Sequence, residues 1–208
     1  KKKKLFIQNN ILTPKYLLLN FKNKINKNEL IKRINNKLGF PVVIKPINEG
    51  SSVGVFICNK KNLFKKIFYL RDNKEIIIER YIPGKEIQAA IMGNKKLGAI
   101  ELKPKRKFYD YKAKYDANAK TEHIMPAEIS KANYLKVMNI SLKAHKLLKC
   151  KGTTRSDFRF YKNKFYLLEL NTQPGMTSLS LVPEIAKFNN ISFFNLIKWM
   201  ISDASIRR

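Results

Sequence analysis

Acidic residues, cysteines and long apolar segments are all scarce in this sequence. The 208 residues include 15 Asp and Glu against 43 Lys and Arg, and the formal net charge is +28. No apolar run approaches the ~18 residues that a membrane-spanning helix requires, so no such helix is expected. The two cysteines, Cys58 and Cys150, lack the CxxC spacing of a metal or redox site. We expect both to be reduced side chains that contribute to packing.

The first residues bear little similarity to a secretion signal. Lys1–Lys4 is a basic cluster, but the apolar stretch Leu5–Ile7 that follows it is too short for the core of a signal peptide. No small-residue cleavage site follows this stretch. We therefore expect a cytoplasmic location and no membrane partner.

The large positive charge is a property that nucleic-acid-binding proteins share. Here the basic residues are spread along the whole chain, are mostly Lys, and accompany abundant Asn and Ile. This joint excess is typical of an AT-biased genome, so no specific nucleic-acid partner is expected. A non-catalytic, basic nucleic-acid-binding protein stays open as an alternative. His123 and His145 lack partners at metal-ligand spacing, and we interpret both as ordinary surface or boundary residues.

Hydrophobic periodicity predicts an α+β protein with two lobes and mainly antiparallel sheets. Hydrophobic residues make up 44% of the chain, which is enough to bury a core. The expected helices are residues 3–10, 27–38, 60–70, 130–149 and 193–201. The expected strands are residues 15–19, 41–46, 55–58, 76–78, 86–92, 97–103, 157–161 and 165–171, with an irregular stretch over 105–126. We place the two lobes at residues 1–78 and 79–208.

A loop rich in glycine and serine, Asn48–Gly54, joins two of the expected strands. It lacks both the lysine and the following helix of a Walker loop. Its backbone N–H groups could still surround phosphates, and Lys45 just before it could neutralise their charge. By itself this pattern is more typical of an ordinary hairpin turn.

The expected hairpin near the C-terminus concentrates acidic residues in a chain that has few of them. If residues 162–164 form a three-residue loop, Tyr161 opposes Phe165, and Asp157 then opposes Glu169. Period-two alternation places Asn171 on the same face as Glu169. Two opposed carboxylates destabilise a sheet unless a cation lies between them, and these oxygens suit magnesium. A solvent-exposed stripe neutralised by nearby lysines is the alternative.

The end of this hairpin resembles the signature of a known family. Residues 169–177 read ELNTQPGMT and are similar to the ExNTxPGMT motif of the D-alanine–D-alanine ligases of the ATP-grasp superfamily. Four more segments match the family in the same order: residues 41–54 (its PVxxKP and EGSSVG segments), 79–86 (its ExxxxGxE hinge), 108–115 (FYDYxAKY) and 155–158 (RxDF). The resemblance covers most of the chain and implies an ATP-grasp fold, in which two lobes sandwich ATP.

The resemblance also implies roles for the residues at the matching positions. Lys45 and Lys114 would contact the ATP phosphates, with the loop of Ser51 and Ser52 closing over them. Glu79, Tyr81 and Ile82 would hold adenine, and Glu86 the ribose. Asp157, Glu169 and Asn171 would hold two magnesium ions, with manganese as a substitute. Arg155 and the Gly175 N–H would stabilise an oxyanion, Ser51 and Tyr115 would belong to the catalytic site, and the substrate contacts would be Tyr109, Ser180 and Leu181.

The activity that the resemblance implies is the ATP-dependent joining of two D-alanine molecules through an acyl phosphate, for peptidoglycan precursor synthesis. Tyr115 is typical of family members that form this dipeptide. Another ATP-grasp carboxylate–amine ligase stays open as an alternative, as does a simple helix-capping role for Ser180. Family members commonly form homodimers. They also carry a further α/β lobe before the matching region, so this chain alone is expected to be weak or inactive.

Overall fold

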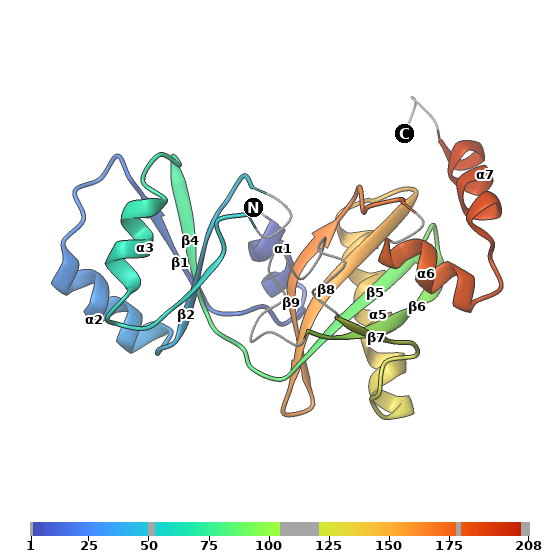
Figure 1. The fold of residues 1–208 in the computed structure, drawn as a ribbon, viewed down its shortest axis with the longest axis horizontal. Coiled ribbons are helices and arrows are strands. Elements are labelled where there is room, and N and C mark those ends of the chain that lie inside the picture. The colour runs from blue at the N-terminus through green and yellow to red at the C-terminus, as the bar shows by residue number, and fades with distance from the viewer. Residues whose placement is uncertain (1, 50–52, 105–120, 178–179, 205–208) are drawn as a thin grey trace. The chain divides into compact units, whose positions relative to one another are not determined.

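The computed structural model describes residues 2–49, 53–104, 121–177 and 180–204. Within this part the chain forms two compact units. One unit is Pro14–Ile82, and the other combines Lys1–Thr13, Pro83–Lys103 and Glu122–Arg208. Each unit contains helices and one antiparallel sheet (Figure 1). No helix among the described residues is long and apolar enough to cross a membrane.

The first unit is a four-stranded sheet with two helices packed into a common core. The strand order is β1-β4-β2-β3, and all neighbouring strands are antiparallel. These elements are β1 (Tyr16–Asn20), α2 (Lys27–Lys37), β2 (Val42–Pro46), β3 (Phe56–Cys58), α3 (Leu63–Tyr69) and β4 (Glu75–Arg80). Ile76 and Ile78 on the central strand β4 are fully buried with Ile34 of α2 and Leu63 of α3. Helix α2 begins where the Asn26 side chain accepts hydrogen bonds from two N–H groups of its first turn.

The second unit is a five-stranded sheet with the order β7-β6-β5-β8-β9. Its elements are α1 (Lys2–Gln8), β5 (Lys85–Met92), β6 (Lys95–Lys103), β7 (Glu122–Ile124), α5 (Lys131–Leu147), β8 (Thr153–Tyr161), β9 (Lys164–Asn171), α6 (Leu181–Phe188) and α7 (Phe193–Asp203). Helix α5 packs against one face of the sheet, where alternate residues Ile87, Ala89 and Ile91 of β5 join its core. The intervening residues of β5 lie on the opposite face. That face carries the polar residues described below.

The division into units differs from the expected lobe boundaries at two places. Residues 79–82 group with the first unit, and residues 2–13 group with the second. The N-terminal segment belongs there because Phe6 and Ile11 are buried in the core of the second unit. The N–H of Leu167 in β9 also donates to the carbonyl of Leu12 at 2.8 Å. The sequence could not predict this placement, because the pattern of a short amphipathic segment does not indicate which sheet it packs against.

Most expected helices and strands are present within two or three residues of the predicted ends. One prediction was wrong, because residues 122–124, expected to be irregular, form strand β7. This strand pairs with the end of β6, with Glu101 opposite Ile124. Three residues are too few to show a period-two pattern, so only the pairing with β6 defines this strand.

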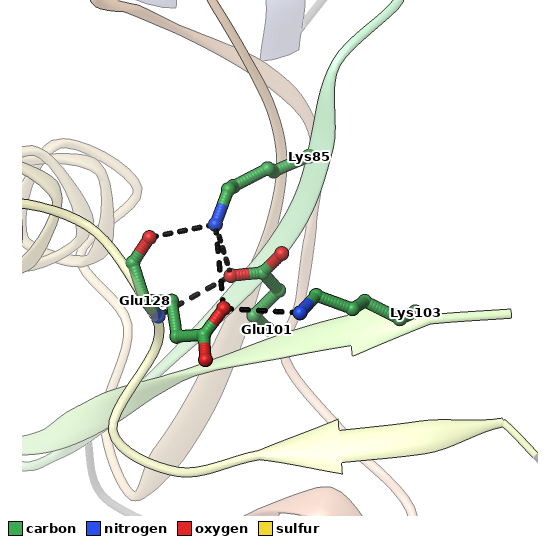
Figure 2. A network of polar contacts seen from close by, with 4 residues as sticks. All are labelled: Lys85, Glu101, Lys103 and Glu128. Carbon is green, nitrogen blue, oxygen red and sulfur yellow. Dashed lines mark hydrogen bonds and ion pairs between the residues drawn. The ribbon is translucent and has the colours of Figure 1, made fainter.

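A network of four charged residues fixes the beginning of β5 (Figure 2). The Lys85 ammonium lies 2.8 Å from a carboxylate oxygen of Glu101, which is only 1% exposed. It also donates to the Glu128 carbonyl at 2.7 Å, while the Glu128 N–H donates to the same Glu101 oxygen. Lys103 pairs with the Glu128 carboxylate at 3.0 Å; this hydrogen bond raises the pKa of Lys103 and lowers that of Glu128. The buried carboxylate of Glu101 is thus satisfied by a cation and a backbone donor.

Replacement of Lys85 by Met is expected to destabilise the fold by about 2–4 kcal/mol, because it leaves Glu101 charged and unpaired in the interior. Urea unfolding of the purified chain measures this change. The double variant Lys85→Met/Glu101→Gln should recover much of the loss, since a neutral amide can still accept the Glu128 N–H. Lys103→Met is the matched control and should unfold at the wild-type midpoint, because its partner is exposed. Equal losses of stability in Lys85→Met and Lys103→Met would contradict the conclusion that Lys85 is the cation that stabilises the buried Glu101 carboxylate.

Both cysteines are free, as expected, and Cys58 is fully buried in β3. Burial raises the pKa of the Cys58 thiol from 9.0 to about 11, and it also raises the pKa of Cys150. The unfolded chain therefore loses the Cys58 proton at a lower pH than the folded chain. The resulting stability is present below pH 9 and is lost as the pH rises from 9 through 11.

Cys58→Val, which keeps an apolar side chain and removes the titration, is expected to reduce the alkaline loss of stability by about 2–3 kcal/mol. The measurement is the free energy of unfolding of both proteins at pH 8 and at pH 11. Other groups titrate equally in the two proteins, so their contribution cancels in the comparison. Parallel losses in the wild type and the variant would show that the thiol is not protected in the folded state.

Candidate functional site

The hairpin between β8 and β9 closes with a two-residue loop. Lys162 and Asn163 both have positive φ, at 47° and 56°, and Tyr161 pairs with Lys164. The expected three-residue loop with Tyr161 opposite Phe165 was therefore wrong. Two successive left-handed residues form the tight turn whose twist matches that of the flanking strands, and Asn tolerates this conformation well.

A β-bulge in β9 nevertheless restores the predicted register at the acidic end. Phe158 pairs with Leu167, but the next residue back, Asp157, pairs with Glu169, so Leu168 is an extra residue. The prediction that Asp157 opposes Glu169 is confirmed, although the bulge and not the loop produces this pairing. The sequence does contain a signal for it. The buried residues of β9 are Phe165, Leu167 and Leu170, a spacing of two and then three.

One face of this hairpin brings four of the predicted site residues together. Arg155 pairs with Asn171 in the ladder, directly beside Asp157 and Glu169. Arg155 binds Asp157 through both oxygens, with Nε 2.8 Å from Oδ1 and Nη2 3.0 Å from Oδ2. The Asn171 amide donates to Asp157 Oδ2 at 3.2 Å. Asp157 is only 5% exposed, so the alternative of a solvent-exposed stripe neutralised by lysines does not describe it.

The donor set on this face fits a hard divalent cation. Two carboxylates and an amide occupy adjacent ladder positions on the side of the sheet away from the α5 core. Rotation of the Asn171 amide presents its oxygen instead of its nitrogen. Among the described residues no cluster of three His, Cys, Asp or Glu side chains could hold a metal, so the set depends on two acids and one amide. A cation would compete with Arg155 for the Asp157 carboxylate.

One polar residue on this face was not predicted from the sequence. Gln88 in β5 pairs with Asp157 across the ladder and is 1% exposed. Its amide oxygen Oε1 has no hydrogen-bond partner among the residues that the structure describes. A polar residue in the middle of the apolar strand 87–92 was the available signal, because a buried amide without a partner is unfavourable unless something else satisfies it. Gln88 therefore adds a second amide to the polar face.

The predicted ribose contact Glu86 is held at the beginning of β5. Arg159 in β8 lies opposite it and donates to Glu86 Oε2 at 3.2 Å and to the Gly84 carbonyl at 2.7 Å. Gly84 has φ +98°, and a Cβ there would lie 2.2 Å from the Phe160 carbonyl oxygen, so glycine is required. Arg159 was not predicted from the sequence. With Lys85 bound to Glu101 on the other face, both sides of this strand end are fixed.

In the first unit the structure joins two residues whose roles were predicted separately. Lys45 of β2 and Glu79 of β4 form an ion pair of 3.0 Å, and the Glu79 side chain is 3% exposed. The pair leaves Lys45 partly exposed at 22%, with its ammonium oriented by a buried carboxylate. Tyr81 and Ile82 follow β4, and the Tyr81 N–H donates to the Pro41 carbonyl at 3.3 Å. That N–H is therefore used within the fold.

Thr177 and Ser180 contact each other close to the beginning of α6. Ser180 occupies the N-cap position, but its hydroxyl makes no capping hydrogen bond to the helix. It instead accepts the Thr177 N–H at 3.1 Å and lies 2.9 Å from the Thr177 hydroxyl. A Cβ at Gly175 would lie 2.9 Å from the Ser180 hydroxyl, so the two residues are in close contact. The helix-capping alternative for Ser180 is therefore wrong, and the first N–H groups of α6 lack a side-chain cap from Ser180.

Five of the predicted site residues lie outside the described part of the chain: Ser51, Ser52, Tyr109, Lys114 and Tyr115. Their roles stay predictions. Within the second unit the structure brings together Arg155, Asp157, Glu169 and Asn171, and places Glu86 on the same face of the sheet. Gly175, Ser180 and Leu181 form a second group at the beginning of α6.

The sequence and the fold of this chain are similar to those of known proteins. The family model for the D-ala D-ala ligase C-terminus matches residues 5–202. A D-alanine–D-alanine ligase of Pelagibacter ubique is 61% identical over 206 residues, which cover 99% of this chain and 67% of that protein. The D-alanine–D-alanine ligase of Paramagnetospirillum magneticum is 43% identical over 170 residues, which cover 79% of this chain and 55% of that protein. The chain thus spans roughly half to two thirds of the length of these relatives.

Solved structures show the same fold. The D-alanine–D-alanine ligase of Bacillus anthracis superimposes with a TM-score of 0.83 at 35% identity, covering 97% of this chain and 65% of that one. The VanG D-Ala:D-Ser ligase of Enterococcus faecalis superimposes with a TM-score of 0.82 at 28% identity, covering 97% of this chain and 59% of that one. The α+β, ATP-grasp fold with two antiparallel sheets is therefore confirmed. The chain accordingly belongs to the D-alanine–D-alanine ligase family and corresponds to the C-terminal part of its members.

Proposed function

We propose that this chain supplies the nucleotide-binding and bond-forming part of an enzyme that joins two D-alanine molecules at the expense of ATP. The observation that carries the proposal is the ladder register of β8 and β9, which places Arg155, Asp157, Glu169 and Asn171 on one face. An oxyanion donor and a set of hard oxygen ligands are adjacent there. Phosphoryl transfer followed by attack on an acyl group requires both.

The proposed reaction has two steps. A carboxylate oxygen of the first D-alanine attacks the γ-phosphorus of ATP, which forms an acyl phosphate and breaks the bond to ADP. The amine of the second D-alanine then attacks the acyl carbon. The new carbon–nitrogen bond forms through a tetrahedral intermediate, the amine loses a proton, and phosphate leaves. Arg155 and the Gly175 N–H would donate to the oxyanion of that intermediate, a contribution of about 3–4 kcal/mol for one such donor.

The remaining residues would orient the nucleotide and the second substrate. Glu79 holds the Lys45 ammonium at 3.0 Å, and from this position Lys45 would contact phosphate. Glu86, held by Arg159, would accept hydrogen bonds from the ribose hydroxyls. Asp157, Glu169 and Asn171 would hold magnesium, which would neutralise charge on the transferred phosphoryl group. The beginning of α6 would bind the carboxylate of the second D-alanine through Ser180 and the Leu181 N–H, because uncapped helix N-termini bind anions.

The choice of D-alanine as second substrate rests on the names of the relatives together with the sequence of the segment that contains Tyr115. A solved relative with the same fold is named a D-Ala:D-Ser ligase, so the fold alone does not select the second substrate. We propose D-alanine because Tyr115 lies within a segment that matches the dipeptide-forming members. The product would enter peptidoglycan precursor synthesis in the cytoplasm, where ATP is available, and a homodimer is the expected assembly.

The whole-protein activity is expected from the complete product of the reading frame that encodes these residues. A chimera in which this chain replaces the aligned part of the P. ubique relative provides an independent route. Both should release phosphate in the presence of ATP, magnesium and D-alanine, and D-alanyl-D-alanine should be the product detected by mass spectrometry. The 208-residue chain alone should bind Mg-ATP weakly and form little dipeptide.

Substrates other than D-alanine decide between the alternatives in the same assay. Preferential incorporation of D-serine would replace the dipeptide proposal with that of a D-Ala:D-Ser ligase. Phosphate release only with an unrelated acid would indicate another carboxylate–amine ligase. A salt-resistant, sequence-selective RNA complex without any ligase activity would support the nucleic-acid-binding alternative.

Glu169→Gln tests the metal site separately from turnover. Without metal the variant should be as stable as the wild type or slightly more stable, since one of two opposed carboxylates is neutralised. With magnesium and a non-hydrolysable ATP analogue, the rise in melting temperature expected for the wild type should largely disappear. Glu128→Gln, a surface carboxylate of the same unit, is the control and should respond like the wild type. Unchanged magnesium and nucleotide affinity in Glu169→Gln would exclude Glu169 as a ligand.

A further inference from the structure

His123 and Glu184 form a contact that joins β7 to α6. The imidazole Nδ1 lies 2.7 Å from the Glu184 carboxylate oxygen Oε2, and the two side chains are 29% and 35% exposed. An ionised carboxylate has no proton to give, so Nδ1 is the donor of this hydrogen bond. The sequence alone predicts an ordinary surface residue at His123, because its partner lies 61 positions away in the chain.

Glu184 lies in the first turn of the helix whose N-terminus would bind the second substrate. Its N–H donates to the Ser180 carbonyl at 3.2 Å, so it is placed one turn, about 5.4 Å along the axis, beyond Ser180. The Ser180 hydroxyl leaves the helix N-terminus without a side-chain cap, and this end of the helix attracts anions. Glu184 is the acidic residue of that turn.

This position creates an electrostatic conflict. The helix N-terminus attracts a carboxylate, while the Glu184 charge one turn away repels it. At separations of about 6–8 Å and an effective dielectric constant between those of a protein surface and of water, two like charges change an affinity by about three- to tenfold. A cation beside Glu184 removes most of this penalty, and a neutral hydrogen-bond donor reduces it in part. His123 is placed to be that donor.

We propose that His123 is a positioning residue for the second substrate: it compensates the charge of Glu184 and holds α6 so that its N-terminus binds the substrate carboxylate. This inference rests on the proposed function, since it assigns a carboxylate to the beginning of α6. His123 does not need to touch the substrate. Partly exposed ion pairs contribute little to stability, so the contact is expected to act on binding more than on folding.

The test uses the complete reading-frame product, or the chimera with the P. ubique relative, with D-alanine varied over a wide range at saturating ATP. Initial rates then separate the half-saturating concentrations for the first and the second D-alanine. His123→Leu should raise the second value by about three- to tenfold and leave the first value and the KM for ATP within about twofold of wild type. Its melting temperature should stay close to that of the wild type.

Three further variants distinguish compensation of the Glu184 charge from a role in which the contact with His123 only holds α6 in place. Glu184→Gln should leave the second half-saturating concentration unchanged or lower it, because the repulsive charge is gone. The double variant His123→Leu/Glu184→Gln should behave like Glu184→Gln alone and not like His123→Leu. His123→Gln retains a hydrogen-bond donor without charge and should fall between wild type and His123→Leu.

The inference fails if His123→Leu leaves the second half-saturating concentration unchanged, or if the double variant is as impaired as His123→Leu. Equal increases in both half-saturating concentrations of D-alanine and in the KM for ATP would indicate a general structural role and would also overturn the inference. If His123→Leu does not fold, the half-saturating concentration for the second D-alanine is compared between His123→Gln, Glu184→Gln and the wild type instead. A wild-type protein without D-alanine-dependent phosphate release would instead refute the proposed function.

Discussion

The opposition of Asp157 and Glu169 is the feature on which the rest of the site depends. A strand with one buried face has a fixed register, because a shift by one residue would move every core side chain to the other face. The bulge at Leu168 shifts the alternation of side chains along β9 by one residue. Before it, Phe165 and Leu167 face the α5 core, and after it Leu170 does so while Glu169 and Asn171 face the other side. One extra residue therefore lets a single strand build both a core and a ligand-bearing face.

Charge compensation is the second constraint, and it is visible in how the fold uses its few acidic residues. The described part of the chain buries four carboxylates, and each is paired with a cation: Glu79 with Lys45, Glu86 with Arg159, Glu101 with Lys85 and Asp157 with Arg155. A buried carboxylate without such a partner would be strongly unfavourable. Three of these four acids are predicted ligand contacts, which gives a reason for a chain with a net charge of +28 to retain them there.

Local sequence patterns were sufficient for much of this description. Helical and strand periodicities located most elements, and residue spacing alone predicted the acidic pair, although through a loop of the wrong length. The predictions failed where the deciding contact was distant in the chain. Strand β7 exists only through its pairing with β6, and residues 2–13 join the second unit only through contacts with β9 and its core. Arg159 and Gln88 were not predicted, and His123 was interpreted as an ordinary residue, because the residues they lie against are on other strands or helices.

The sequence by itself determined the α+β class, the identity of the carboxylates and the collinear motifs that mark the family, because these depend on local patterns and residue types. Tertiary structure decided which charges meet. Only the folded sheet shows that Arg155 rather than a lysine compensates Asp157, that Ser180 does not cap its helix, and that His123 reaches Glu184. The physical reason is that hydrogen bonds and ion pairs form between atoms a few ångströms apart, and residues far apart in the chain reach those distances only after the strands have paired and the helices have packed.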